Sequence, residues 1–183
     1  MPYGRTVRRG GACNRLAEPH WGNPLDTSHS KRRGGRWNAP GSYGALYLNA
    51  TERMARIQVE HKLAGHPYGI EDLDPVQQYD LVDVDVAETD ALDLVSARGL
   101  RAVGLATTYQ LDERGRPIAH ATCHPVGQAA YDDQLPAIAC ISAARGADPT
   151  DEALTIFDRN VAELVSPTRR RPFADWYLGP PPH

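Results

Sequence analysis

Apolar side chains along this chain follow two different periods, which divide its middle into predicted strands and helices. Residues 44–49 contain the short apolar run Ala-Leu-Tyr-Leu, which predicts a buried strand. Residues 78–86 alternate apolar and mostly acidic side chains, a pattern typical of a half-buried strand. Residues 137–141 are all apolar and residues 153–158 contain Leu-Thr-Ile-Phe, so both predict strands, and residues 91–95 are a further candidate.

The segment after the first predicted strand has the period of a helix that begins near Thr51 and ends before residues 65–67. Thr51 or Asn49 can cap its first turn. Spacings of three and four residues place four side chains on its inner face: Met54, Ile57, Gln58 and His61. At about 100° per residue, Glu60 lies roughly 160° from Gln58, so the helix directs Gln58 rather than Glu60 toward the core.

Other segments complete the predicted fold. Residues 96–104 and 122–131 predict helices, and the turn-rich residues 109–117 separate them. Short strands mixed with helices, without regular βαβ crossovers, indicate an α+β fold rather than a doubly wound sheet.

The two ends of the chain carry few periodic apolar positions. Residues 1–30 are rich in Gly, Arg, Asn, Pro and His, and they predict an irregular arm with at most one short helix near residues 14–18. Residues 166–183 contain an arginine run and a proline-rich end, and they predict a poorly ordered tail. We therefore expect a single domain over residues 1–183 with its core in residues 30–158.

Composition limits the classes of function. The chain has 183 residues, 41% hydrophobic and 23% charged, with a net charge of −3. These values are typical of a globular protein and give no bulk electrostatic reason to bind nucleic acid or an anionic membrane. No apolar run reaches transmembrane length, and the first residues do not have the pattern of a signal peptide.

The cysteines and histidines do not predict a metal site. Cys13, Cys123 and Cys140 lack metal-type spacing, and their odd number favours the reducing cytoplasm as the setting. His120 and His124 flank Cys123 at the spacing of one helical turn, but no further ligands accompany them.

A glycine-hinged loop before the first predicted strand presents Arg36. The loop glycines, which let the backbone approach a ligand closely, are Gly34, Gly35, Gly41 and Gly44. A guanidinium is a rigid fork of donors that matches phosphate oxygens, and Tyr47 on the following strand adds aromatic surface. The loop therefore suits a ligand with phosphates and a planar ring. The alternative is a surface loop in which Arg36 forms a structural salt bridge.

These segments, together with Ser142, resemble the RES family. Family members have a Gly-Gly-Arg-Trp or Gly-Gly-Arg-Phe loop, a Leu-Tyr-Leu strand, a helix containing Ala-x-x-Glu and, much later, an apolar strand ending in a Ser-Ala-Arg-like turn. The corresponding residues here are Gly34-Gly35-Arg36-Trp37, Leu46-Tyr47-Leu48, Ala55-Arg56-Ile57-Gln58 and Ile141-Ser142-Ala143-Ala144-Arg145-Gly146. The resemblance covers roughly residues 30–158. One position departs from the pattern, because Gln58 stands where the family has Glu.

The resemblance implies a compact fold similar to that of ADP-ribosyltransferase toxins, and it implies consumption of NAD. Some family members cleave nicotinamide from NAD with water or phosphate, and others transfer the ADP-ribose to a protein. All of these reactions break the same N-glycosidic bond, through a transition state with positive charge on the ribose. The resemblance also implies the toxin of a bacterial toxin–antitoxin pair, whose partner is an Xre-type helix-turn-helix antitoxin covering the NAD cleft.

Site roles follow from the same resemblance, which assigns catalysis to Arg36, Tyr47, Gln58 and Ser142. Arg36 is expected to bind the pyrophosphate or the nicotinamide ribose. Ser142 is expected to donate to the nicotinamide or ribose; no catalytic triad surrounds it, so it is not expected to be a nucleophile. Trp37, Tyr43 and Tyr47 are expected to contact the nicotinamide ring. The alternatives are core aromatic residues and a serine that only closes a turn.

Gln58 separates two hypotheses. A glutamate would offset the oxocarbenium charge, whereas a glutamine keeps an acceptor oxygen without the charge, and losing one electrostatic partner typically slows a reaction by about 10²–10³. Either the enzyme is slow or specialised for transfer, or Glu60 or, better placed, His61 supplies the missing function. Otherwise activity is lost, and the chain is a RES-like module that binds NAD or a protein partner. Nucleic-acid binding through the basic runs is disfavoured by the net acidity.

Overall fold

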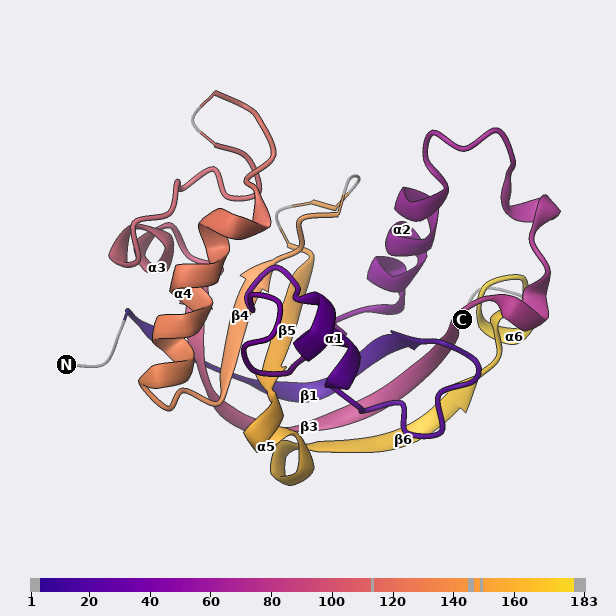
Figure 1. Ribbon diagram of the computed structural model, residues 1–183, viewed down its shortest axis with the longest axis horizontal. Helices are drawn as coiled ribbons and strands as arrows, with labels where there is room; N and C mark the ends of the chain where they lie inside the picture. Colours follow the sequence, from indigo (N-terminus) through magenta and orange to yellow (C-terminus); the bar gives the residue numbers. More distant parts are fainter. Residues whose placement is uncertain (1–3, 113, 145–146, 149, 180–183) are drawn as a thin grey trace.

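The protein's computed structural model describes residues 4–112, 114–144, 147–148 and 150–179. Within these ranges, six strands form one mixed sheet in the order β1-β2-β5-β4-β3-β6, with a further pairing between β1 and β3 (Figure 1). The strands are β1 (Thr6–Ala17), β2 (Ala45–Asn49), β3 (Asp80–Leu94), β4 (Ala137–Ile141), β5 (Glu152–Phe157) and β6 (Val165–Arg171). All pairings are antiparallel except that of β3 with β4.

Helices lie toward both ends of the sheet. They are α1 (Ser28–Arg33), α2 (Glu52–Leu63), α3 (Ala97–Ala102), α4 (His120–Asp132), α5 (Asp158–Leu164) and α6 (Phe173–Trp176), with the 3-10 turns η1 (Ile70–Asp72) and η2 (Pro75–Gln77) between α2 and β3. In Figure 1, α3 and α4 lie beside β4 at one end, and α2 and α6 lie toward the other. This mixture of helices and a largely antiparallel sheet confirms the predicted α+β class.

The long strand β3 controls the shape of the sheet. It joins two segments that the sequence predicts as separate strands, residues 78–86 and 91–95. Its first half lies between β1 and β6, and residues 91–94 run parallel with β4. Because β1 also pairs with β2 at Asn14 and Asn49, the sheet curves back on itself. This curvature brings the ends of β1 and β2 toward α2.

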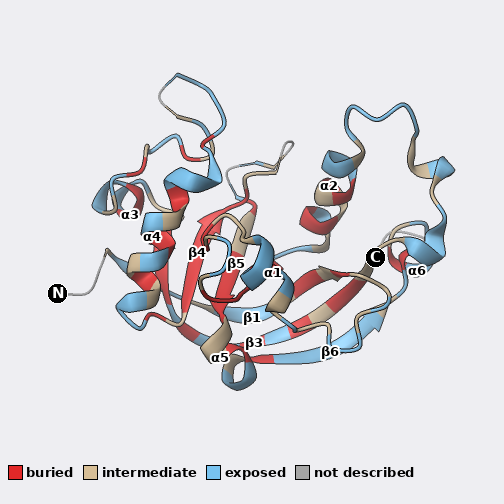
Figure 2. Cartoon of the chain, viewed as in Figure 1, coloured by how far each residue is buried: buried red, intermediate tan, exposed pale blue. Residues whose placement is uncertain are grey.

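Burial on both faces explains the continuous apolar sequences of β4 and β5. On β4, Ile138 and Cys140 face a cluster that includes side chains of α4, whereas Ala137 and Ala139 face a second cluster on the other side of the sheet. Figure 2 shows the buried residues concentrated in β4, β5 and the inner side of α4. The exit of β4, which carries Ser142, therefore rests on a packed support.

The prediction of an irregular arm at residues 1–30 is wrong, because residues 6–17 form β1 and residues 28–33 form α1. The short helix expected at residues 14–18 is also wrong. Much of β1 is exposed, and its stability comes from the hydrogen-bonded ladder with β3 rather than from an apolar face. A ladder of this kind leaves little hydrophobic pattern in the sequence.

The prediction of a poorly ordered tail at residues 166–183 is wrong over its described part. Residues 165–171 form β6 on the edge of β3, and Phe173 and Trp176 of α6 are buried. Arg171 forms ion pairs with Glu52 (2.9 Å) and Asp83 (2.9 Å), so the arginine run ties the end of the chain to α2 and β3. Residues 180–183 lie outside the described residues.

Candidate functional site

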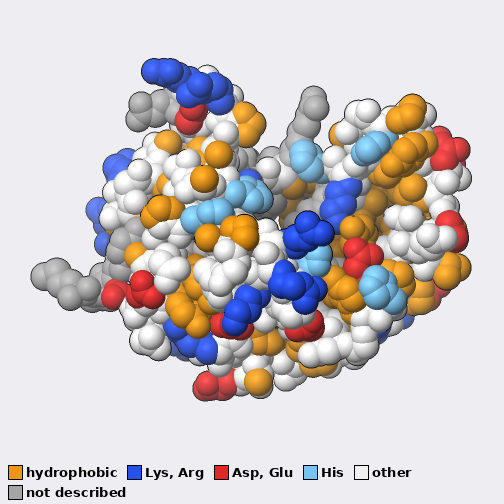
Figure 3. Space-filling view, in the orientation of Figure 1, with side chains coloured by type: hydrophobic (Ala, Val, Ile, Leu, Met, Phe, Trp, Pro, Cys, Tyr) orange, Lys and Arg blue, Asp and Glu red, His pale blue; other side chains and the backbone are white. Residues whose placement is uncertain are grey.

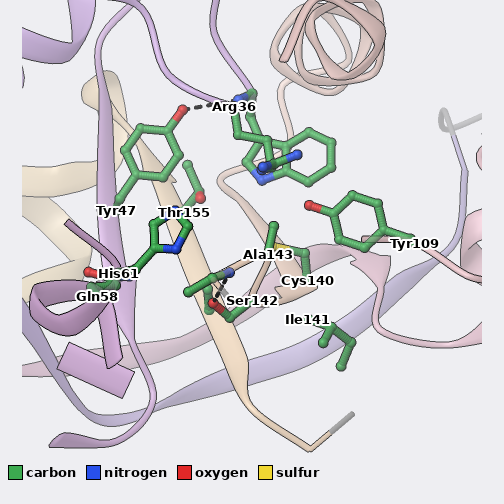
Figure 4. A pocket seen from close by; sticks show the side chains of 13 residues that line it. Arg36, Tyr47, Gln58, His61, Tyr109, Cys140, Ile141, Ser142, Ala143 and Thr155 are labelled. Carbon is green, nitrogen blue, oxygen red and sulfur yellow. Dashed lines mark hydrogen bonds between the residues drawn. The ribbon is translucent and has the colours of Figure 1, made fainter. Parts of the chain in front are cut away.

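A cavity of about 250 Å³, here called the first cavity, brings most of the predicted site residues together (Figure 4). The predicted residues on its wall are Arg36, Trp37, Tyr47, Gln58, His61 and Ser142. They come from the glycine loop, β2, α2 and the exit of β4, elements that are far apart in the sequence. Tyr109, Cys140 and Thr155 also line the wall.

The glycine loop holds Arg36 at the edge of the first cavity. Gly34 has a φ of +74°, and a Cβ there would come within 2.9 Å of the backbone nitrogen of Pro40, so the turn requires glycine. Arg36 Nη1 donates to the carbonyl of Ile118 (3.2 Å), and its guanidinium lies 6.0 Å from the centre of the Tyr109 ring. Among the described residues no carboxylate forms a salt bridge with Arg36. The structure therefore does not show the structural salt bridge considered as an alternative.

Tyr47 supports the loop with its hydroxyl and presents its ring to the first cavity. The hydroxyl accepts from the backbone N–H of Trp37 (3.0 Å) and donates to Asn38 Oδ1 (2.7 Å). Burial raises the pKa of Tyr47 above its ordinary value, so the phenol stays neutral. Trp37 is 1% exposed and packs against Tyr109, with ring centres 5.8 Å apart. Trp37 is thus mainly a core residue that also borders the cavity.

Tyr43, which was expected to contact the ligand, lies behind the loop and lines neither the first cavity nor the larger one beside it. Tyr43 is buried, stacks on Tyr131 with ring centres 4.1 Å apart, and meets the edge of Phe157. Its hydroxyl donates to the carbonyl of Trp37 (2.5 Å). Tyr43 therefore supports the glycine loop through its hydrogen bond to Trp37 and does not border the first cavity.

Gln58 and His61 face the first cavity from α2, as the helical period predicts. Thr51 caps the helix, because its hydroxyl accepts from the N–H of Met54 (3.3 Å). Gln58 Nε2 donates to Asn49 Oδ1 (2.7 Å), which fixes the side chain against the end of β2. Glu60 is exposed on the opposite side of the helix and does not line the first cavity, so it brings no carboxylate to that cavity.

The turn after β4 fixes Ser142 through hydrogen bonds on every side. Its N–H donates to the carbonyl of Asp151 (2.7 Å), its hydroxyl accepts from the N–H of Ala144 (3.2 Å), and its carbonyl accepts from the Gln110 side chain. Asp151 in turn accepts from Arg53 of α2, which also pairs with Asp148. Arg145 and Gly146 of the motif lie outside the described residues.

A second cavity of about 510 Å³ shares Arg36, Tyr47 and Gln58 with the first. Its other charged or aromatic lining residues are Arg15, Glu18, Trp21, His29, Lys62, Tyr79 and His120. Lys62 Nζ lies 3.7 Å from the centre of the Tyr79 ring. Figure 3 shows further Lys and Arg side chains gathered over α1 on this face. Three cations against one carboxylate make the lining of the second cavity attractive to an anion.

Arg15 is buried in the wall of the second cavity. Its guanidinium donates to the carbonyls of Pro24 (2.7 Å) and Asp26 (3.1 Å) and lies 5.2 Å from the Trp21 ring centre. Burial lowers the pKa of Arg15 to about 10, with the Asp26 carboxylate acting in the opposite direction. Carbonyl partners leave its positive charge uncompensated by a direct salt bridge among the described residues.

A family model described as the RES domain matches residues 12–175, which is most of the chain. The chain belongs to the RES family. This RES domain is also similar to a chain in the crystal structure of the M. tuberculosis MbcT–MbcA toxin–antitoxin complex, with a TM-score of 0.75 and 21% identity over 94% of this chain and 90% of that chain. No curated protein matches the chain. At 21% identity the structural likeness shows the shared fold.

The sequence did not predict two side chains that line the first cavity, Tyr109 and Thr155. Tyr109 lies in the turn-rich excursion between α3 and α4, where no periodic pattern singles it out. Thr155 is the one polar position within the run Leu-Thr-Ile-Phe of β5, a signal that could have been read as a functional hydroxyl. The hydroxyls of both are buried and have no hydrogen-bond partner among the described residues.

Two kinds of feature are absent from the described residues of this RES domain: a membrane-spanning helix and a group of three potential metal ligands. The part of the chain that the structure describes contains no helix long and apolar enough to cross a bilayer. In the same residues, no three His, Cys, Asp or Glu side chains are grouped so that they could hold a metal ion.

Proposed function

We propose that this RES protein binds NAD and breaks the bond between nicotinamide and ribose, with the ADP-ribose passing to water, phosphate or a protein. The observation that carries the proposal is the convergence of Arg36, Tyr47, Gln58 and Ser142 on one cavity. A guanidinium that has no carboxylate partner among the described residues, beside aromatic and hydroxyl groups, suits a phosphate joined to a flat ring. If these four residues only stabilised the fold, they would not need to surround a cavity.

The sizes of the two cavities favour a ligand that spans both. At about 250 Å³, the first cavity is smaller than the roughly 300–1,000 Å³ of typical ligand pockets, so it suits the nicotinamide end alone. The second cavity, with Arg15 and Lys62 on its wall, suits the pyrophosphate and adenosine. Arg36 lines both cavities, so we place it where the nicotinamide ribose joins the pyrophosphate.

In this arrangement the N-glycosidic bond breaks with its electron pair moving to the nicotinamide nitrogen, which loses its positive charge. The ribose carbon becomes an oxocarbenium centre and is captured by the acceptor. Gln58 Oε1 accepts from a ribose hydroxyl, and Ser142 donates to the nicotinamide or ribose. Tyr47 and Trp37 provide flat surface for the ring.

Among the described residues that line the first cavity, none is a carboxylate. Without the negative charge of a Glu at position 58, the transition state loses one electrostatic partner, which typically slows catalysis by about 10²–10³. We therefore propose a slow enzyme. The second candidate function, favoured by the same observation, is a catalytically weak or inactive RES-like module that binds NAD or a protein partner.

Nicotinamide release separates these functions. Purified protein is incubated with NAD, alone and with phosphate or candidate protein acceptors, and the released nicotinamide is quantified. We expect slow release by the native chain and a rate about 10²-fold higher for Gln58→Glu, because the charge is restored at the ribose. The matched control is Glu60→Gln, which makes the reverse exchange on the outer face of the same helix and should leave the rate unchanged.

Absence of release by the native chain in every mixture, together with activity in Gln58→Glu, would support the inactive module instead. Calorimetric titration with NAD then distinguishes its two forms. Tight binding without turnover indicates a nucleotide sensor, and no binding indicates a protein scaffold.

We further propose that the protein is the toxin of a toxin–antitoxin pair that acts in the cytoplasm, with an Xre-type helix-turn-helix antitoxin as its partner. Family membership and the fold shared with a chain of a toxin–antitoxin complex support this assignment. Expression of the chain alone and together with the product of an adjacent helix-turn-helix gene tests it. Growth arrest relieved by that product, with a complex that copurifies, is the expected result; equal growth in both cases would contradict it.

A further inference from the structure

Two buried hydroxyls in the wall of the first cavity have no hydrogen-bond partner among the described residues: Tyr109 Oη and Thr155 Oγ1. Tyr109 is 6% exposed and Thr155 is 1% exposed, so bulk solvent does not compensate them. Most buried polar groups in native proteins are hydrogen-bonded, and exceptions cluster where a ligand or a function requires them. Both side chains line the same cavity, which indicates a shared ligand.

The strand register places Thr155 close to Cys140. Thr155 of β5 is paired with Tyr47 of β2 and with Ile138 of β4. Cys140 follows Ile138 by two positions and therefore lies on the same face of the sheet, diagonal to Thr155. Tyr109 and Cys140 line the same cavity and belong to the same buried cluster, and a thiol is only a weak hydrogen-bonding group. Figure 4 shows Tyr109 and Thr155 on opposite sides of the cavity, with Cys140 and Ala143 between them.

This arrangement has polar groups at two edges and an apolar surface between them. Ala143, Ala153 and the Cys140 side chain form that surface, and Tyr47 and Trp37 border it with aromatic rings. A flat ring fits the apolar part. A carboxamide on the ring carries both a donor and an acceptor, and each hydroxyl can act in either role.

We propose that the hydroxyls of Tyr109 and Thr155 bind the amide-bearing aromatic leaving group of the substrate. This inference rests on the proposed function and names the residues that recognise the ring half of NAD. Neutral hydroxyls suit this task, because the ring is positively charged before cleavage and neutral after it. Burial raises the pKa of Tyr109 well above its ordinary value, so its phenol keeps its proton in both states.

The test removes each hydroxyl without changing the shape of the side chain, in Tyr109→Phe and Thr155→Val. Calorimetry measures the affinity of each variant for two probes: a carbocyclic NAD analogue whose nicotinamide cannot leave, and ADP-ribose, which lacks the ring. Tyr68→Phe is the matched control, because Tyr68 is 43% exposed and lines neither cavity. Thermal unfolding of each ligand-free variant shows that the fold is retained.

We expect each variant to bind the analogue about 10-fold more weakly than the native chain, which is the effect of one lost hydrogen bond. ADP-ribose affinity should stay within about twofold, and the Tm should not fall, because neither hydroxyl has a hydrogen-bond partner among the residues that the structure describes. Thr155→Ser, which keeps the hydroxyl, should bind the analogue like the native chain.

Unchanged affinity for the analogue in both variants would overturn this inference while leaving the proposed function in place. Equal weakening of the analogue and ADP-ribose would also overturn it, because the effect would then not concern the ring. Failure of the native chain to bind either probe would instead overturn the proposed function, and the inference with it.

Discussion

Arg36 lines both cavities, and its Nη1 donates to the carbonyl of Ile118 (3.2 Å) and to the thiol of Cys123 (3.9 Å). A bidentate guanidinium recognises phosphate by geometry as well as charge, which an ammonium cannot do. The proposed role therefore depends on the shape of this side chain.

The substitution Arg36→Lys tests that dependence. We expect about 10–100-fold weaker binding of NAD, because charge is kept while the charge-assisted fork is lost. Titration calorimetry measures it. The control Arg33→Lys makes the same exchange on exposed α1, outside both cavities, and should change the affinity less than twofold. Equal effects of the two substitutions would contradict a specific role for Arg36.

At single positions, sequence analysis succeeded where a local rule applied. The period of α2 places Gln58 and His61 on its inner face, and the structure has both at the cavity wall. Tyr43 and Tyr109 show the limit, because each is a tyrosine in an irregular segment. Tertiary packing in one buried cluster, rather than a local pattern, places Tyr43 away from the cavity and Tyr109 at its border.

Helix α2 and the turn after β4 form two walls of the first cavity, and an ion pair between Arg53 and Asp151 connects them. Arg53 of α2 pairs with the largely buried Asp151, whose carbonyl accepts from the N–H of Ser142. The pair therefore couples the helix that carries Gln58 to the turn that carries Ser142. Arg53 acts as a positioning residue in this arrangement.

Loss of this ion pair should misplace Ser142. For Arg53→Ala we expect kcat/KM for nicotinamide release to fall about 10–100-fold, because displacements near 1 Å can have such an effect. Arg53→Lys, which keeps the charge, should restore part of the rate. Glu60→Ala on the outer face of α2 is the control. A rate for Arg53→Ala equal to that of the native chain would show that the turn holds its shape without the ion pair.

Sequence analysis predicted the elements with strong hydrophobic periods and missed those held by pairing. It predicted α2, β4 and β5 to within a few residues, since their apolar positions are regular or continuous. It missed β1, because that strand is mostly exposed and its partner β3 lies more than 60 residues away in the sequence. Hydrogen-bonded pairing at that distance leaves no local pattern.

In the whole molecule, both ends of the chain complete the sheet around the site. β1 and β6 flank the first half of β3, and α6 inserts Phe173 and Trp176 against α2 and β3. Trp176 Nε1 also donates to the carbonyl of Tyr79 (2.9 Å), and Tyr79 lines the second cavity. Residues 165–179 therefore belong to the folded unit.

Trp176→Ala tests this role of the C-terminal segment. We expect the free energy of unfolding to fall by about 3–5 kcal/mol, the usual result of removing a buried tryptophan. Leu178→Ala, two residues later and 52% exposed, should change it by less than about 0.5 kcal/mol. Chemical denaturation followed by circular dichroism measures both. Similar values for the two variants would mean that α6 does not contribute to the core.

Three residues line both the first and the second cavity: Arg36, Tyr47 and Gln58. A compound lodged on either side would meet the same guanidinium and so compete for the contact that a dinucleotide needs. Inhibitors of two dissimilar kinds follow from this: a small aromatic amide for the narrow side, and a bulkier polyanion for the wide, cationic one. A short tether between them would let one molecule occupy both cavities, because binding of one half raises the effective concentration of the other.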